Sequence, residues 1–266
     1  MKYLDLTLPT PEENLACDEA LLDGCDDGDG PEVLRFWEPQ KHFVVVGYSN
    51  RVESEVNVAA CSELGIPILR RCSGGGTVLQ GPGCLDYSLI LRIDSNPAVQ
   101  TVTGTNHFIM ERNRAALETL LVRSSRREEA LSFKSEIRNP KSEISVRGHT
   151  DLAIDGRKFS GNAQRRKRRA VLFHGTFLLR FDLGLIEKCL PSPSKQPHYR
   201  ANRSHRDFLT NIQRKPEEVK DALRTQWQAK QPWGTASFAA IDRLAWQKYS
   251  TPGWTLKFQV DTARLA

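Results

Sequence analysis

The stretch from Ile68 to Leu91 reads I-L-R-R-C-S-G-G-G-T-V-L-Q-G-P-G-C-L-D-Y-S-L-I-L, an apolar strand that passes through two arginines into three glycines and then into a second strand. Gly74 to Gly76 have no Cβ, so a ligand can lie against bare backbone amides there. Arg70 and Arg71 point to opposite faces of the strand, and either can offer a planar guanidinium to a carboxylate or phosphate. A hairpin turn with surface arginines is the alternative, but the doubled arginine favours an anion-binding loop.

A second segment, residues 151–179, begins D-L-A-I-D-G-R-K-F-S-G-N-A-Q. Asp155-Gly156 predicts a two-residue hairpin, because both turn positions favour positive φ. Lys158 then starts the returning strand, and Phe159 points to the opposite face. A strand lysine is usually a solvated surface charge. The small residues of the run Ser160 to Ala163, however, let a ligand approach the backbone closely, so we predict that Lys158 faces a cleft.

Together these segments resemble the lipoate-protein ligase family, within the larger group that also holds biotin protein ligases and octanoyltransferases. The resemblance runs from about Leu34 to Ser250. It rests on R-R-x-S-G-G-G-T-V at residues 70–78, on D-L-A-I-D-G-R-K-F-S-G-N-A-Q at 151–164 and on H-G-T-F-L-L at 174–179. A biotin ligase is disfavoured, because its Gly-Arg-Gly-Arg type of loop is replaced here by Ser-Gly-Gly-Gly.

The resemblance implies an ATP-dependent lipoate-protein ligase, which activates lipoate or octanoate as an acyl-adenylate and passes the acyl group to a lysine of an acceptor protein. Lys158 matches the family's lysine that contacts the acyl carbonyl and the phosphate, and it is the expected catalytic residue. Cationic donors suit this chemistry, because a carboxylate that attacks the α-phosphate of ATP approaches a negatively charged group. The residues expected to hold the acyl-adenylate or line its pocket are Arg70, Arg71, Ser73, Gly74, Gly75, Gly76, Thr77, Val78, Asp151, Gly161, Asn162, Ala163, His174 and Gly175.

The same resemblance implies cofactors and partners. ATP is expected with Mg²⁺, and Asp151 can help to hold the ion, because hard oxygen ligands suit it. A role for Asp151 at the start of a strand and a structural role for His174 stay equally open. The expected acceptors are lipoyl-domain proteins, namely E2 subunits of 2-oxoacid dehydrogenases and the H protein of glycine cleavage, with an accessory subunit as a further partner.

Two other functions stay open. Related octanoyltransferases work through a cysteine thioester without ATP, and Cys72 and Cys189 are the candidates for such a nucleophile. Where one transferase branch carries its cysteine, just before Asp151, this chain has V-R-G-H-T at residues 146–150. The cysteine spacing shows neither C-x-x-C nor a metal-binding pattern, so we expect reduced, mostly buried thiols. The third function is an accessory or binding protein without full ligase activity.

Length and composition fit a cytoplasmic enzyme. The 266 residues are 39% hydrophobic, enough for a full core, and no run of about 18 apolar residues predicts a membrane span. The net charge is +6, and the unbroken basic run Arg165 to Arg169 contributes to it. We expect this run to dock an acidic acceptor domain, because no aromatic interleaving or nucleic-acid motif supports nucleic-acid binding.

The order of elements indicates an α+β fold with mainly antiparallel or mixed sheets flanked by helices. Helices are predicted at residues 10–23, 52–64, 106–122, 182–190, 216–228 and 237–249, and strands at 32–37 and 42–47. Residues 123–145 are charged and poor in aromatics, and the unit K-S-E-I-R-N-P begins twice within them. We interpret them as an exposed, disordered insertion in a catalytic domain at residues 1–250, followed by a C-terminal tail at 251–266.

Overall fold

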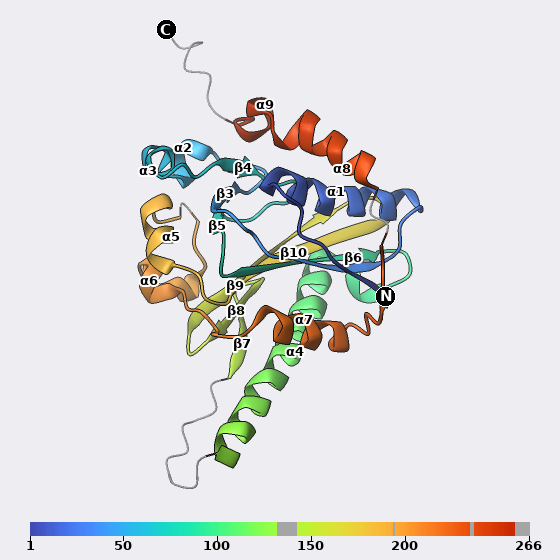
Figure 1. Cartoon of the computed structure of the whole chain (residues 1–266), viewed down its shortest axis with the longest axis vertical. Coiled ribbons are helices and arrows are strands. Elements are labelled where there is room, and N and C mark those ends of the chain that lie inside the picture. The colour runs from blue at the N-terminus through green and yellow to red at the C-terminus, as the bar shows by residue number, and fades with distance from the viewer. Residues whose placement is uncertain (132–142, 194, 235–236, 259–266) are drawn as a thin grey trace.

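The computed structural model describes residues 1–131, 143–193, 195–234 and 237–258. Within these residues the framework is a larger and a smaller sheet with helices packed around them (Figure 1). The larger sheet has eight strands in the order β11-β1-β2-β6-β10-β9-β8-β7, and the smaller has three in the order β4-β3-β5. The predicted α+β class with mixed sheets is therefore confirmed.

Most of the larger sheet is antiparallel. From β2 through β6, β10, β9 and β8 to β7 every neighbouring pair is antiparallel, whereas β1 pairs in parallel with β2 and β11. In the smaller sheet β3 is parallel to β4 and antiparallel to β5. The strand bounds are Lys2–Asp5 (β1), Val33–Trp37 (β2), Phe43–Val46 (β3), Ile68–Arg70 (β4), Val78–Gln80 (β5), Cys84–Arg92 (β6), Ile144–Arg147 (β7), Asp151–Ile154 (β8), Arg157–Arg166 (β9), Ala170–Leu178 (β10) and Gln231–Pro232 (β11).

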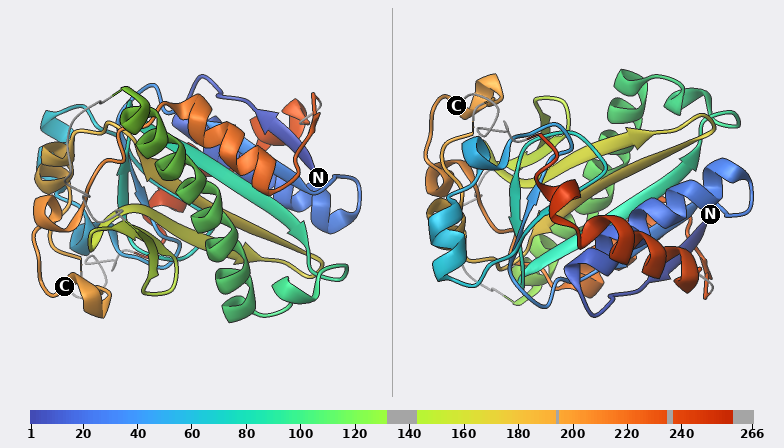
Figure 2. Two further views of the ribbon diagram at one scale, coloured as in Figure 1. Left: turned by 90° about the horizontal axis from the view of Figure 1, so that it is seen from below. Right: turned by 90° about the horizontal axis from the view of Figure 1, so that it is seen from above.

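Helices cover both faces of the larger sheet. Helices α1 and α8 lie over one face, and α4 and α7 pack together over the other (Figures 1 and 2). After α8 the chain continues as one π-helical turn at Ala245–Tyr249, and short 3-10 turns occur at Pro97–Val99 and His198–Arg200. The helix bounds are Pro11–Asp27 (α1), Val52–Glu55 (α2), Val58–Glu63 (α3), Val102–Leu131 (α4), Leu183–Cys189 (α5), His205–Phe208 (α6), Pro216–Gln226 (α7), Phe238–Leu244 (α8) and Pro252–Thr255 (α9).

The two faces of the central strand β6 differ in polarity. The face toward α4 and α7 belongs to one apolar cluster and carries Leu85, Tyr87, Leu89 and Leu91. On the opposite face Ile90 joins a second apolar cluster under α1, but two positions nearer the start of the strand are buried and polar, namely Asp86 and Ser88. Because side chains alternate along a strand, this pattern places polar groups beneath α1 at the end of β6 that lies nearest β5.

Several predicted elements are confirmed with longer bounds. Thr10 caps α1 in a capping box with Glu13, and the helix runs on to Asp27, into the stretch where a loop was expected. The hairpin between β8 and β9 turns at Asp155 and Gly156, whose φ angles of 51° and 71° are both positive as predicted.

The predicted insertion at residues 123–145 overlaps regular structure at both ends. Helix α4 continues to Leu131, and β7 begins at Ile144. Residues 132–142, with most of the repeated unit, lie outside the described residues. In the predicted tail, α9 packs against β4, so residues 252–255 are part of the folded unit. The assignment of residues 1–250 to one catalytic domain stays a prediction.

Within the part of the chain that the structure describes, none of the helices has the length and apolar composition of a membrane span.

Candidate functional site

A cavity of about 820 Å³ lies beside the polar end of β6, a volume typical of a small-molecule site. Its lining comes from α1, from β3 and β5 of the smaller sheet, from β2, β6, β8, β9 and β10 of the larger one, and from the 3-10 turn at His198–Arg200 and α6. The structure brings most of the predicted site residues to this one cavity: Lys158, Arg71, Gly75, Gly76, Thr77, Val78, Asp151, Gly161, Asn162, Ala163, His174 and Gly175. Arg70, Ser73 and Gly74 are not in the lining.

Lys158 faces the cavity because of a β-bulge. The register between β8 and β9 shifts after Leu152, so Ala153 lies opposite Lys158 while Asp151 lies opposite Gly161. Directly opposed residues share a face of a sheet, and so do alternate residues along a strand. Lys158 therefore lies on the same face as Asp151 and Gly161. It precedes Gly161 by three positions, and in a regular strand that odd spacing would place the two residues on opposite faces. Bulges commonly re-aim a side chain in this way beside active sites.

An ion pair holds the amine of Lys158 over β9. Lys158 Nζ lies 2.7 Å from Asp151 Oδ1, and the hydroxyl of Tyr199 donates to Asp151 Oδ2 at 2.9 Å. Both partners of the ion pair retain some exposure to the cavity, 24% for the lysine side chain and 12% for the aspartate. Asp151, for which a role as magnesium ligand was one of two alternatives, is thus engaged by a lysine and a tyrosine.

Gly161 leaves room for this lysine. A Cβ built at Gly161 would lie 2.6 Å from Nζ and 2.8 Å from Cε of Lys158, far closer than such atoms approach. The glycine therefore lets the lysine side chain lie directly over the backbone of β9. The sequence predicted that a ligand can approach the Ser160 to Ala163 run closely. In the structure the group that lies there is the side chain of Lys158.

The cavity follows one row of residues across five strands of the larger sheet. Asp151 on β8 is opposite Gly161 on β9, Gly161 is opposite Thr176 on β10, Thr176 is opposite Asp86 on β6, and Asp86 is opposite Trp37 on β2. All five residues line the cavity. The row leads from the ion pair of Lys158 at one end to an aromatic ring at the other, which suits an elongated ligand.

Arg70 is fully buried and serves the fold. Its three guanidinium nitrogens donate only to backbone carbonyls, from the segment after β3 and from α9. The accepting carbonyls belong to Gly47, Tyr48, Asn50, Trp254 and Thr255. We expected Arg70 to bind the acyl-adenylate, but its hydrogen bonds instead connect α9 to β4.

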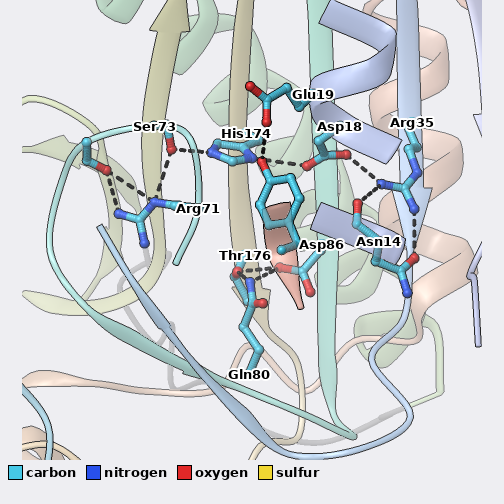
Figure 3. Close-up of polar contacts among 12 residues, drawn as sticks. Asn14, Asp18, Glu19, Arg35, Arg71, Ser73, Gln80, Asp86, His174 and Thr176 are labelled. Atoms are coloured by element: carbon cyan, nitrogen blue, oxygen red, sulfur yellow. Dashed lines mark hydrogen bonds and ion pairs between the residues drawn. The ribbon is translucent and has the colours of Figure 1, made fainter. Parts of the chain in front are cut away.

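Arg71 lines the cavity and shapes the glycine loop. Its guanidinium donates to the carbonyls of Gly74 and Gly76 at 2.6 and 2.7 Å and to Ser73 Oγ at 3.0 Å (Figure 3). Gly75 between them has a φ of +87°, a backbone conformation that favours glycine. Burial lowers the pKa of Arg71 to about 10, so the guanidinium stays charged at neutral pH. The loop is thus wrapped around a cation.

His174 belongs to a chain of buried polar groups. Its Nε2 is 2.5 Å from Ser73 Oγ and its Nδ1 is 3.1 Å from Asp18 Oδ2, while Asp18 pairs with Arg35 (Figure 3). Burial alone would raise the pKa of Asp18, but Arg35 and the hydrogen bond with His174 outweigh it and hold that pKa below its usual value. An ionised Asp18 accepts from Nδ1–H of His174 and so fixes the imidazole tautomer. The chain of contacts thus joins α1 to the glycine loop through the cavity wall.

The sequence reasoning missed Asp18 and Asp86. A signal for each was present, because each is an acidic residue in a mostly apolar stretch: Asp18, beside Glu19, in L-A-C-D-E-A-L-L and Asp86 in C-L-D-Y-S-L-I-L. Asp86 Oδ1 accepts from Gln80 Nε2 at 2.6 Å and from the hydroxyl of Thr176. Burial raises the pKa of Asp86 well above its usual value, against the opposing effect of the Thr176 hydrogen bond.

All the cysteines of the chain lie in described segments, and each one is buried and free. None of them lines the cavity. Burial raises the pKa of Cys72 to about 12, and it also raises the pKa of Cys189. A buried thiol with a raised pKa is a poor nucleophile, because the thiolate is the reactive form. The expectation of buried, reduced thiols is met.

The basic run Arg165 to Arg169 covers the end of β9 and the turn that leads to β10. Arg165 lies over the ring of Tyr48. Further members contact the protein itself: Arg166 donates to the Val99 and Gln100 carbonyls, Lys167 pairs with Asp23, and Arg169 donates to the Asp26 carbonyl. Docking of an acidic acceptor by this run stays a prediction.

In the described residues, no group of three or more His, Cys, Asp or Glu side chains is arranged to hold a metal ion.

Comparisons with known proteins find relatives that cover most of the chain. Residues 10–228 match the lipoyl protein ligase A/B catalytic domain. The octanoyltransferase LipM of Geobacillus kaustophilus is 30% identical over 281 residues, which cover 96% of this chain and 98% of the relative. The octanoyltransferase LipM of Anoxybacillus flavithermus is 27% identical over 278 residues, with the same coverage of 96% and 98%.

Solved structures show the same fold. A bi-partite lipoate protein ligase from Thermoplasma acidophilum has a TM-score of 0.76 and 22% identity, with 98% of each chain covered. A lipoate-protein ligase A bound with ATP has a TM-score of 0.74 and 24% identity, with 97% of this chain and 100% of that chain covered.

The prediction of an ATP-dependent, adenylate-forming ligase is wrong. The curated relatives that span nearly the whole chain are octanoyltransferases. The structure offers a physical reason for the error. The prediction relied on Arg70 and Arg71, together with Lys158, to neutralise a phosphate, but Arg70 gives each donor nitrogen to backbone carbonyls and Arg71 donates to the carbonyls of its own loop.

Proposed function

The chain belongs to the lipoyl protein ligase A/B catalytic-domain family, and we propose that it transfers an octanoyl-type acyl group from an activated thioester to a lysine of a lipoyl-domain acceptor protein. The observation that carries the proposal is the single row of cavity residues that ends at Lys158. An E2 subunit or a glycine-cleavage H protein as acceptor, an accessory subunit and a cytoplasmic location belong to the same proposal.

The reaction requires an amine to attack the carbonyl carbon of a thioester. The carbon–sulfur bond then breaks, the thiol leaves, and the proton lost by the amine balances the thiolate. Negative charge builds up on the carbonyl oxygen on the way, and a positioned cation stabilises it. Lys158 is suited to this role, because its Nζ lies over Gly161 of the row and is held there by Asp151 at 2.7 Å.

The apolar side chains of the cavity suit the acyl chain. Leu15, Trp37, Val45 and Val78 come from four different elements and lie in the same lining as Lys158. Burying an alkyl chain against them contributes about 0.8 kcal/mol for each methylene group. This burial would hold the chain while its carbonyl meets the lysine.

The direct test is transfer without nucleotide. The purified chain is mixed with an octanoyl thioester and a lipoyl-domain protein in the absence of ATP, and intact-mass spectrometry follows the acceptor. We expect the acceptor to gain one octanoyl group, and an acceptor whose lysine is replaced by Arg to gain none. Acylation that requires ATP and releases pyrophosphate would contradict the proposal.

We further predict that no cysteine carries the acyl group. Cys72→Ala and Cys189→Ala should each keep the transfer rate within about a factor of three, because burial raises the pKa of both thiols and the thiolate is the reactive form. The measurement is the initial rate of acceptor acylation. In parallel, the enzyme is incubated with donor alone and analysed by mass spectrometry under non-reducing conditions.

The alternative is the thioester route of related octanoyltransferases. An octanoyl thioester trapped on either cysteine, together with loss of transfer in the matching variant, would establish that route and contradict the prediction. Cys25→Ala serves as the matched control, because Cys25 is also buried and burial raises its pKa to about 11, yet it lies in α1 and is not a candidate nucleophile.

A further inference from the structure

The carboxylate of Asp151 is shared between two groups from different segments of the chain. Its Oδ1 holds the amine of Lys158 at 2.7 Å, and its Oδ2 accepts from the hydroxyl of Tyr199 at 2.9 Å. Burial and the neighbouring carboxylate raise the pKa of Tyr199, so its hydroxyl stays protonated and remains a donor. Tyr199 does not line the cavity. It can therefore influence a ligand there only through the residues that it contacts.

The segment that carries Tyr199 also packs against the hairpin that carries Lys158. The backbone N–H of Thr210 donates to the carbonyl of Lys158 at 2.9 Å, and Arg203 donates to the carbonyl of Gly156 at 3.1 Å. Helix α6 of the same segment lies beside β9 (Figure 1). These contacts hold the main chain of the hairpin, but none of them reaches the amine of Lys158. The amine depends on Asp151 for its position.

Contacts other than the hydroxyl fix the place of Tyr199. Its ring centroid lies 5.1 Å from that of Phe208, which is buried, and its carbonyl accepts from Arg203 Nη2 at 2.9 Å. Because the ring and the main chain are held separately, the hydroxyl meets Asp151 from a defined position. A phenylalanine at residue 199 would keep the ring and main-chain contacts and would remove only the hydrogen bond to the carboxylate.

We infer that Tyr199 is a positioning residue for acyl transfer: its hydroxyl holds Asp151, and Asp151 in turn holds the amine of Lys158 over Gly161. The inference rests on the proposed function for the catalytic role of Lys158. A carboxylate engaged through one oxygen only can turn about its Cβ–Cγ bond, and the lysine would follow it on its flexible stem. A displacement of about 1 Å at a catalytic group can reduce the rate about 100-fold. The rate therefore depends on a hydroxyl that no substrate touches.

The chain contains a matched arrangement outside the cavity. The hydroxyl of Tyr249 donates to Glu19 Oε2 at 2.7 Å, and Lys248 Nζ lies 2.7 Å from the same oxygen. None of these three residues lines the cavity. Tyr249→Phe thus removes the same kind of hydrogen bond from the same kind of ion pair. Because Tyr249 is buried, this variant also reports any general loss of stability that follows the removal of a tyrosine hydroxyl. It is the control for Tyr199→Phe.

Tyr199→Phe is expected to lower kcat for octanoyl transfer about tenfold and to keep KM within about a factor of two, because the hydroxyl acts on the lysine and not on ligand binding. Tyr249→Phe should match the wild type. In a chain that already carries Lys158→Ala, Tyr199→Phe should cause no further loss, since the group that it positions is gone. Thermal unfolding is recorded beside the rates. Equal kcat values for the two phenylalanine variants, or additive losses with Lys158→Ala, would overturn the inference.

Chemical labelling tests the positioning without catalysis. The wild type and Tyr199→Phe are treated with a limiting amount of acetic anhydride, and mass spectrometry of peptides gives the acetylation rates of Lys158 and Lys248. We expect Lys158 to react roughly fivefold faster in the variant, because an amine released from a carboxylate is more available to the reagent, and Lys248 to react at an unchanged rate. An unchanged rate at Lys158 would overturn the inference. A wild-type chain that transfers no octanoyl group would count against the proposed function, and the labelling would still decide the role of Tyr199.

Discussion

Lys158→Ala is expected to lower kcat/KM for acyl transfer by about 10²- to 10³-fold, the usual loss when one positioned donor to a developing oxyanion is removed. The fold should persist, because the lysine side chain is partly exposed and the Tyr199 hydroxyl still donates to Asp151 when the lysine is removed. Initial rates of octanoyl transfer, measured beside thermal unfolding, give both quantities. Because Lys158 is expected to act on the transition state, the loss should lie mainly in kcat.

Lys248→Ala is the matched control. Lys248 also pairs with a carboxylate, with Nζ 2.7 Å from Glu19 Oε2, and its side chain is 23% exposed, but it does not line the cavity. Removing it takes away a lysine and an ion pair without touching the row of residues that leads to Asp151. We expect near-normal rates from this variant. A folded Lys158→Ala protein that is as active as Lys248→Ala would exclude the catalytic role of Lys158.

Local signals predicted the parts of the site that depend on neighbouring residues. Asp155-Gly156 fixed the hairpin, and the small residues after Phe159 indicated a cleft at Lys158. Both follow from backbone preferences that act over a few residues. The bulge between β8 and β9 carries no such signal, because it depends on how two strands pair. The sequence therefore indicated that Lys158 is exposed to a cleft but not that it shares a face with Asp151.

The role of Arg70 could not be predicted from its surroundings in the chain. Two adjacent arginines beside three glycines resemble an anion site, and one of them does face the cavity. The carbonyls of Trp254 and Thr255 that accept from Arg70 come from α9, nearly two hundred residues further along the chain. Contacts of such sequence separation are decided by the packing of the whole domain, and the pattern around residue 70 contains no trace of them.

The motifs indicated the family and left the reaction open. A lysine beside a glycine loop can stabilise charge on a carbonyl oxygen whether the leaving group is an adenylate or a thiol. The difference lies in whether cationic donors remain for a phosphate, and Arg71 shows how this depends on structure. Its guanidinium is bound by the carbonyls of Gly74 and Gly76, contacts that the glycine pattern alone does not predict. The chemistry therefore had to come from the geometry and from relatives across the full chain.

Gly161→Ala is expected to separate activity from stability. The new methyl group would lie 2.6 Å from Nζ and 2.8 Å from Cε of Lys158, so the lysine must leave its place over β9. The end of a lysine side chain moves easily, and alanine lowers the entropy of the unfolded chain, so the melting temperature should stay unchanged or rise slightly. A displacement of about 1 Å at a catalytic group can reduce the rate about 100-fold, which is the loss we expect in kcat.

A double variant tests whether the methyl group acts through the lysine. If Gly161→Ala reduces the rate by displacing Lys158, it should have little further effect once Lys158 is alanine, so the two losses should be far from additive. Additive losses would mean that the methyl group obstructs the acyl chain instead, and KM would then rise. Gly253→Ala is the control, because a Cβ at that glycine meets no atom within 4 Å. Its activity should match that of the wild type, because the new methyl group displaces no atom and Gly253 does not line the cavity.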